Sequence, residues 1–198
     1  RFFRSPYCWQ VIRNTLILSV YGIVICFPAP IILALLINEV KSQGYKKVVQ
    51  TVTYLPHFIS LVVVTGIIKD FTMSTGLITD IVVFFGGERQ SLIQNPNIVS
   101  EIWQGIGWGS IIYLSALAGV SEDLYEAAAI DGAGRWKKLV NVTIPAIMPT
   151  IVTMLIMRLG QVLGSNYEKT ILLYNEATYE TADVISSYVY RVGLLDRD

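Results

Sequence analysis

The sequence has few charged residues and few residues that bind metals. Only 15% of its 198 residues are charged, 15 basic side chains balance 15 acidic ones, and there is a single histidine. A neutral chain offers no basic surface for nucleic acid. Cys8 and Cys26 lack C-x-x-C spacing, so we expect neither a disulfide framework nor a metal site. No Gly-x-x-x-x-Gly-Lys string followed by Ser or Thr is present to wrap the phosphates of ATP.

Hydrophobic residues, in contrast, are abundant. They make up 53% of the chain, and the mean hydropathy is +0.54. A helix needs about 20 apolar residues to cross a bilayer core. Four stretches of about that length contain no Asp, Glu, Lys or Arg, namely residues 14–38, 48–68, 102–121 and 139–157. The sequence therefore predicts an all-α, polytopic membrane bundle with spans at about 14–38, 48–68, 101–120 and 145–164. Pro28 and Pro30 should kink the first span.

Lysine and arginine indicate the orientation of these spans, because short loops rich in them remain cytoplasmic. The connections 39–47 and 122–138 fall on one side and carry a dense set of basic residues. We expect them to be cytoplasmic, although arginines 1, 4 and 13 cluster on the opposite side. Residues 165–198 are too polar to span and should form an extracytoplasmic segment. Within it, one helical face is predicted from Val184, Ile185, Tyr188, Val189 and Val192.

The loop at residues 121–144 reads as two helices joined by a turn. Ser121 is a good N-cap, with acidic residues directly after it and a run of alanines further on. Gly132 and Gly134 should break this helix, and a second short helix at 135–142 should end at Pro145. Alanines on one face let another backbone approach closely. From residue chemistry alone, a docking element and a solvated loop are equally good interpretations.

The string YEAAAIDGAGRWKKLVNVTIPAIMP contains Glu-Ala-Ala, a Gly four residues after the second Ala, and a terminal Ile-Pro. It resembles the EAA motif of binding-protein-dependent ABC transporter permeases, which have a MetI-like fold. The stretches RNTLILSVYG, FPAPIILALLINEV, YLPHFIS and GWGSIIYLSAL are similar to the sugar-uptake branch, with its polysaccharide and oligosaccharide permeases of the LplB type. Val142 and Ile144 stand where the family often has Ile and Leu, which is a conservative departure.

The resemblance implies a fold with six core spans, of which the second to fifth are expected here, in a chain incomplete at both ends. It implies an ATP-driven importer of an oligosaccharide or polysaccharide-derived sugar. The implied partners are a second permease subunit, an ABC ATPase dimer and an extracytoplasmic sugar-binding lipoprotein, in the lipid bilayer of the bacterial cell membrane. This chain would hold no cofactor, with ATP and Mg on the partner ATPase. The residues implied to couple to that ATPase are Glu126, Ala127, Ala128, Asp131, Gly132, Ala133 and Pro145.

Sugars are bound by aromatic faces and by polar groups that pair with hydroxyls, so such residues at membrane depth are candidates for the substrate pathway. They are Trp103, Gln104, Trp108, Tyr113, Arg158, Gln161 and Asn166. Arg158 lies about 20 Å along a helix from Pro145. Snorkelling or structural pairing and lining of the pathway are equally good interpretations of it. For His57 we expect a buried, satisfied imidazole, and the glycines at 105, 107 and 109 should allow close helix packing.

Two other functions fit a helical membrane bundle. A secondary transporter usually carries coupling acids within its spans, whereas the acids here lie in loops and at span ends. A non-transport membrane adaptor is the second alternative. A membrane-embedded enzyme has only His57 and Asp70 as a candidate pair, and these lie 13 residues apart.

Overall fold

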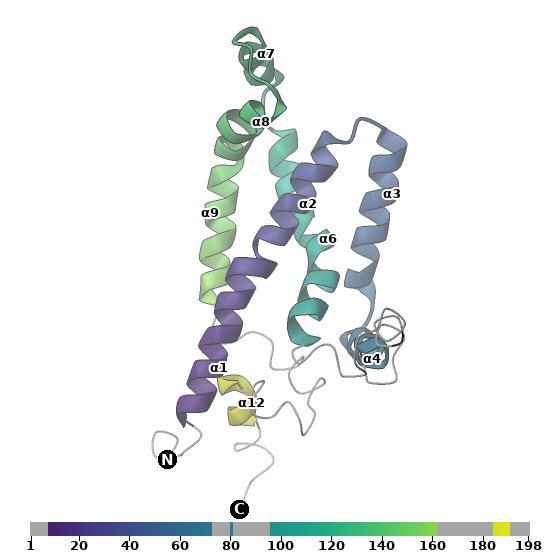
Figure 1. Ribbon diagram of the computed structural model, residues 1–198, viewed down its shortest axis with the longest axis vertical. Helices are drawn as coiled ribbons and strands as arrows, with labels where there is room; N and C mark the ends of the chain where they lie inside the picture. The colour runs from purple at the N-terminus through teal and green to yellow at the C-terminus, as the bar shows by residue number, and fades with distance from the viewer. Residues whose placement is uncertain (1–7, 73–79, 81–95, 162–183, 191–198) are drawn as a thin grey trace, which may run out of the picture.

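The computed structural model describes residues 8–72, 80, 96–161 and 184–190, and this part of the chain is helical (Figure 1). The predicted all-α bundle is confirmed. The first rod consists of α1 (Cys8–Tyr21), the π-helical turn η2 (Gly22–Cys26) and α2 (Pro28–Glu39). It forms one helix of 32 residues that is apolar enough to cross a membrane. The predicted disturbance takes the form of a widened turn, in which the Phe27 N–H donates to the Gly22 carbonyl at 2.9 Å, and Pro28 begins α2.

The second predicted span is not one straight helix. Residues 48–68 fall on α3 (Gln43–Tyr54), the 3-10 turn η3 (Leu55–Phe58) and α4 (Leu61–Thr72). The part up to Phe58 and the part from Leu61 are bent by 104°. Pro56 cannot donate a helical hydrogen bond, and Ile59 is extended at φ −81° and ψ 136°. The Gln104 side chain donates to the Ile59 carbonyl at 3.2 Å, which satisfies that carbonyl at the bend.

Helix α6 (Pro96–Ala118) lies at the centre of the bundle and contacts η2, α2, α3, η3, α4 and α9. The core around it is formed by Ala34, Tyr113, Leu117 and Ile147. Two of the three glycines expected to permit close packing do so. A Cβ at Gly107 would lie 1.9 Å from the Thr53 carbonyl oxygen, and one at Gly109 would lie 3.0 Å from Pro30.

The fourth predicted span begins earlier than expected. The short helix α8 (Arg135–Lys138) does not end before Pro145, as predicted, but continues through the π-helical turn η4 (Leu139–Thr143) into α9 (Ile144–Gly160). Pro145 lies in the first turn of α9, where its missing N–H costs little because the π-helical turn has already changed the bonding pattern. The result is one apolar helix of 26 residues, about 39 Å long.

Within the described residues, fewer than four helices are long and apolar enough to match the four predicted spans. Two helices are long and apolar enough to cross a membrane, or three if the bent pair counts as one span. Helix α6, the third predicted span, is 23 residues long but is not among them. Glu101, Gln104 and the glycines lower its apolar character, and its central position removes much of it from contact with lipid.

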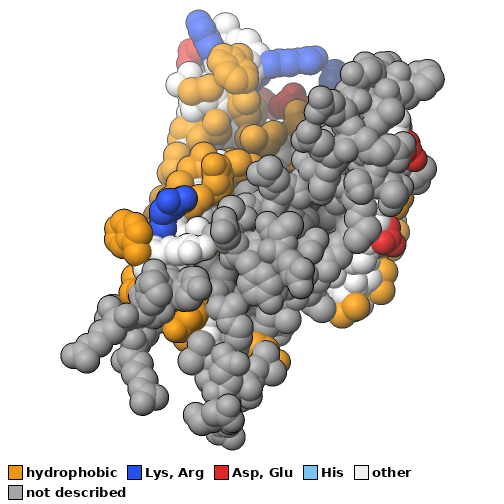
Figure 2. Space-filling model, turned by 60° about the horizontal axis from the view of Figure 1, so that its bottom comes forward, with side chains coloured by type: hydrophobic (Ala, Val, Ile, Leu, Met, Phe, Trp, Pro, Cys, Tyr) orange, Lys and Arg blue, Asp and Glu red, His pale blue; other side chains and the backbone are white. Residues whose placement is uncertain are grey.

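The ends of the bundle differ in character. Helices α7 (Glu122–Ile130) and α8 lie at the same end as the connection from α2 to α3, as the predicted topology requires (Figure 1). Basic side chains gather at this end, beside an extensive apolar face (Figure 2). The short helix α12 (Ile185–Tyr190) contacts α1 at the opposite end, where the Ile185 N–H donates to the Thr15 hydroxyl at 3.0 Å. It confirms a helix in the predicted C-terminal segment; residue 192 lies outside the described part.

Candidate functional site: the α7–α8 elbow and the bundle cavity

Residues 121–144 form an elbow that projects from one end of the bundle (Figure 1). The Ser121 hydroxyl accepts a hydrogen bond from the Asp123 N–H at 3.3 Å, which confirms the predicted N-cap of α7. Glu122 and Asp123 lie in the first turn, where negative charge favours the positive end of the helix dipole. The start of α7 is therefore fixed by neighbouring residues alone.

The turn after α7 requires glycine. Gly132 has φ of 72°, in the left-handed region, as a helix-terminating glycine does. Its N–H donates to the Ala129 carbonyl at 3.0 Å, and the Ala133 N–H donates to the Ala128 carbonyl at 2.9 Å. These two bonds make a Schellman motif that satisfies the last carbonyls of α7. Gly134 is extended and leads into α8.

Helix α7 of the elbow is linked by a side-chain contact to the spanning helix that begins with α8. The Tyr125 hydroxyl lies 3.1 Å from the Thr143 hydroxyl, which joins α7 to η4. Between α7 and the segment formed by α8 and η4 is a hollow of about 420 Å³. It is lined by Leu124, Ala127, Ala128, Asp131, Ala133, Lys137, Asn141 and Val142.

The predicted coupling residues thus separate into four groups. Ala127, Ala128, Asp131 and Ala133 line the hollow, and Gly132 makes the turn. Glu126 is exposed on α7. Pro145 lies on α9 and does not line the hollow.

Two residues of the elbow that the sequence reasoning did not single out are strongly exposed. Ile130 is 87% exposed and Trp136 is 75% exposed. Apolar side chains this open at a projecting end are typical of a surface that meets a partner.

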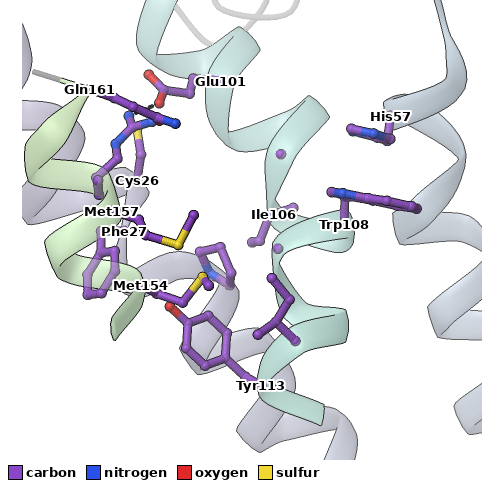
Figure 3. Close-up of a pocket in the computed structure, with 15 residues that line it drawn as sticks. Cys26, Phe27, His57, Glu101, Ile106, Trp108, Tyr113, Met154, Met157 and Gln161 are labelled. Carbon is purple, nitrogen blue, oxygen red and sulfur yellow. Dashed lines mark hydrogen bonds and ion pairs between the residues drawn. The ribbon is translucent and has the colours of Figure 1, made fainter. Parts of the chain in front are cut away.

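A second site lies inside the bundle, between η2, α2, η3, α6 and α9. It is a cavity of about 440 Å³ lined mostly by apolar and aromatic side chains, with Tyr113 toward one end and Glu101 and Gln161 at the other (Figure 3). Of the predicted pathway residues, it brings together Trp108, Tyr113, Arg158 and Gln161. Aromatic walls with a few polar groups are the usual composition of a small-molecule site.

An ion pair lies at one end of this cavity. The Arg158 guanidinium on α9 pairs through Nη2 with a carboxylate oxygen of Glu101 on α6. Their side chains are 27% and 16% exposed, so both are partly withdrawn from solvent. The sequence reasoning named Arg158 but missed Glu101, which lies 57 residues away. The signal available was that Glu101 directly precedes an apolar run, where an acid is unusual.

Aromatic rings form the other notable contact. The His57 and Trp108 rings stack with centroids 4.4 Å apart and an interplanar angle of 3°, on the side of α6 away from Met154 and Met157 (Figure 3). Phe58 meets Trp108 edge to face at 5.9 Å. The expectation of a buried imidazole is wrong, because His57 is exposed and contacts an aromatic face.

The remaining pathway candidates lie elsewhere. Trp103 is 39% exposed and does not line the cavity. Gln104 holds the carbonyl at the α3–α4 bend instead. Asn166 lies outside the described residues. Within the described chain, no group of three or more His, Cys, Asp or Glu side chains is arranged to hold a metal ion.

Comparison with known proteins gives consistent matches. Residues 15–168 match the family described as "Binding-protein-dependent transport system inner membrane component". The chain is similar to Protein LplB (40% identity over 200 residues) and to the polygalacturonan/rhamnogalacturonan transport system permease protein YteP (42% over 201 residues), both from Bacillus subtilis (strain 168). Each match covers 98% of this chain and 63% of the relative, so the chain spans less than two thirds of their length.

A solved structure is also similar throughout the chain. It is a bacterial alginate ABC transporter in complex with an alginate pentasaccharide-bound periplasmic protein. One of its chains matches at 46% identity with a TM-score of 0.93, covering 98% of this chain and 70% of that chain. The similarity therefore extends over sequence and fold together.

Proposed function

Because the chain belongs to the family of binding-protein-dependent transport system inner membrane components, we propose that it is the permease subunit of an ATP-driven ABC importer. Its cargo is an oligosaccharide or a polysaccharide-derived sugar delivered by an extracytoplasmic binding protein. The names of YteP and of the alginate transporter, both concerned with polysaccharides, support this class of cargo.

The observation that carries the proposal is the elbow. It is locally rigid, since its cap, its Schellman turn and its Tyr125–Thr143 contact fix the relation between α7 and η4. It presents exposed Glu126 and Ile130 at one end of the bundle. A rigid projection continuous with a membrane helix can transmit the movement of a soluble partner into the bundle.

The partner proposed for the elbow is a cytoplasmic ABC ATPase dimer, which would bind ATP and Mg. A second permease subunit would complete the pathway, because the described helices leave apolar faces exposed. On this proposal the end that carries α7 and α8 is cytoplasmic. The end with the Glu101–Arg158 pair then faces the extracytoplasmic binding protein.

The cavity in the bundle is the proposed sugar pathway, with Trp108 and Tyr113 as aromatic surfaces and Arg158 and Gln161 as polar contacts. We expect Gln161→Ala to weaken substrate-stimulated ATP hydrolysis of the assembled transporter severalfold, since one hydrogen bond to cargo is lost. Trp103→Phe, outside the cavity, is the control and should leave the stimulation curve unchanged. A wild-type curve for Gln161→Ala would remove this residue from the pathway.

The proposed function is tested by reversing the charge at the elbow. Glu126→Lys should abolish association with the ATPase and ATP-driven sugar uptake, while membrane insertion stays intact. Glu122→Lys introduces the same charge change in the first turn of α7 and should retain most uptake. Co-purification of the ATPase and uptake by proteoliposomes measure the two effects. Unchanged uptake in Glu126→Lys would contradict the coupling role.

A further inference from the structure

We propose that the Glu101–Arg158 pair is a carboxylate-exchange site that selects acidic oligosaccharides. In this exchange, a uronate carboxylate of the cargo takes the place of Glu101 on the Arg158 guanidinium. The inference rests on the proposed function and specifies the chemical class of its cargo. It follows from how Arg158 is placed, from what surrounds it, and from where Glu101 lies on its helix.

Three elements build the environment of Arg158. It extends from α9, pairs with Glu101 of α6, and lies against η2 of the first rod. A Cβ at Gly22 would lie 3.0 Å from Arg158 Nη2, so the space that a side chain at this position would need is taken by the guanidinium. Gly22 also begins the π-helical turn, and such turns often mark functional sites. The guanidinium is thus held beside the cavity, not extended toward headgroups.

The cavity depends on this one pair for its charge. Among the described residues that line it, Glu101 and Arg158 are the only members of the set Asp, Glu, Lys and Arg. A carboxylate without a cation partner is costly to place against apolar and aromatic walls. A planar guanidinium matches the two oxygens of a carboxylate and has five N–H donors. Arg158 is therefore the group that can hold an acidic sugar here.

Exchange keeps one carboxylate on the guanidinium throughout. Glu101 lies near the start of α6, at the end of the cavity that it shares with Gln161 (Figure 3). Its carboxylate can rotate toward water at that end when the cargo arrives. Gln161 lies three residues from Arg158, at the C-cap of α9, where its amide can pair with a ring hydroxyl next to the bound carboxylate.

The experiment measures direct binding to the complete transporter in nanodiscs without the binding protein, so that only the membrane subunits select the cargo. The two probes are a short oligogalacturonate and the same oligosaccharide with its carboxyl groups reduced to alcohols. Isothermal titration calorimetry gives a Kd for each. The wild type should bind the acidic probe more tightly than the neutral one.

Arg158→Gln should weaken binding of the acidic probe about tenfold to a hundredfold and leave the neutral probe nearly unchanged. Arg158→Lys should fall between, because an ammonium lacks the planar fork. Glu101→Gln removes the competing carboxylate and should tighten acidic binding. Arg13→Gln, an exposed arginine on α1 that does not line the cavity, is the matched control.

The double variant E101R/R158E separates recognition from structure. It retains an ion pair between α6 and α9, so a purely structural pair predicts wild-type binding of both probes. Exchange predicts that acidic binding stays weak, because the guanidinium has moved to α6. Equal loss of both probes in Arg158→Gln, or recovery in the double variant, would overturn the inference. Failure of the proposed function is seen separately, as absence of ATP-driven uptake of either probe.

Discussion

The elbow and the bundle cavity are held together by different kinds of contact. In the elbow, the Ser121 cap spans two residues and the Gly132 turn spans five, and the Tyr125–Thr143 contact reaches 18 positions along the chain. In the bundle, the Glu101–Arg158 pair at the cavity and the Gln104–Ile59 bond at the α3–α4 bend join residues 57 and 45 positions apart. The elbow should therefore keep its form while the bundle moves, whereas the cavity changes whenever α6 and α9 shift. A rigid elbow beside an adjustable cavity is what the transmission of movement from a partner to the substrate pathway requires.

The largest effect is expected in the bundle, at Gly107. An alanine there would place its Cβ 1.9 Å from the Thr53 carbonyl oxygen, so α6 must move away from α3. We expect Gly107→Ala to lower the free energy of unfolding by about 3 kcal/mol, at the upper end for overpacking. Gly105→Ala is the control, since nothing described lies within 4 Å of its Cβ and alanine favours a helix. Equal thermal stability of the two variants would contradict the tight α3–α6 contact.

A smaller effect is expected at the turn of the elbow. Gly132→Ala meets no steric contact, yet a side chain at φ of 72° costs about 1–2 kcal/mol. We expect reduced sugar uptake with unchanged unfolding of the bundle, because the fault is confined to the elbow. Gly134→Ala, at an extended position, should transport normally. The comparison would fail if Gly132→Ala destabilised the bundle as much as Gly107→Ala does.

The smallest effect is expected where the elbow meets the spanning helix. Tyr125→Phe removes the hydroxyl that lies 3.1 Å from the Thr143 hydroxyl, at a cost of about 1 kcal/mol. ATP hydrolysis should persist while the sugar transported per ATP falls slightly, since α7 follows α9 less closely. Tyr45→Phe, at a side chain 62% exposed, should match the wild type. An unchanged ratio of transport to hydrolysis in Tyr125→Phe would contradict a role for this contact in transmitting movement from α7 to the bundle.

The difference between contacts among near neighbours and contacts among distant residues also explains what could be predicted from the sequence. The Ser121 cap and the break at Gly132 were predictable because residue type and near neighbours determine them. The predicted end of the short helix at 142 was wrong, because η4 widens to absorb Pro145 and the helix continues. A proline signals a disturbance of the helix but does not determine whether the helix ends or widens into a π-helical turn.

Contacts between distant residues were harder to anticipate. At the bend after Phe58, the Ile59 carbonyl accepts a hydrogen bond from Gln104, and no local pattern in residues 48–68 reports that partner. Likewise Arg158 was identified as a membrane charge, but its partner Glu101 became evident only when α6 and α9 were placed together. The stacked His57 and Trp108 rings have the same origin.

The central claim is that the elbow faces the cytoplasm and meets an ATPase, and labelling at Ile130 tests it most directly. In full-length protein with Cys8, Cys26 and any cysteine outside these 198 residues replaced by serine, Ile130→Cys places a thiol at a position 87% exposed. A membrane-impermeant maleimide should label it in inverted membrane vesicles stripped of ATPase and not in right-side-out ones, and rebinding the ATPase should block the reaction. Labelling confined to right-side-out vesicles, or unaffected by the ATPase, would contradict the account.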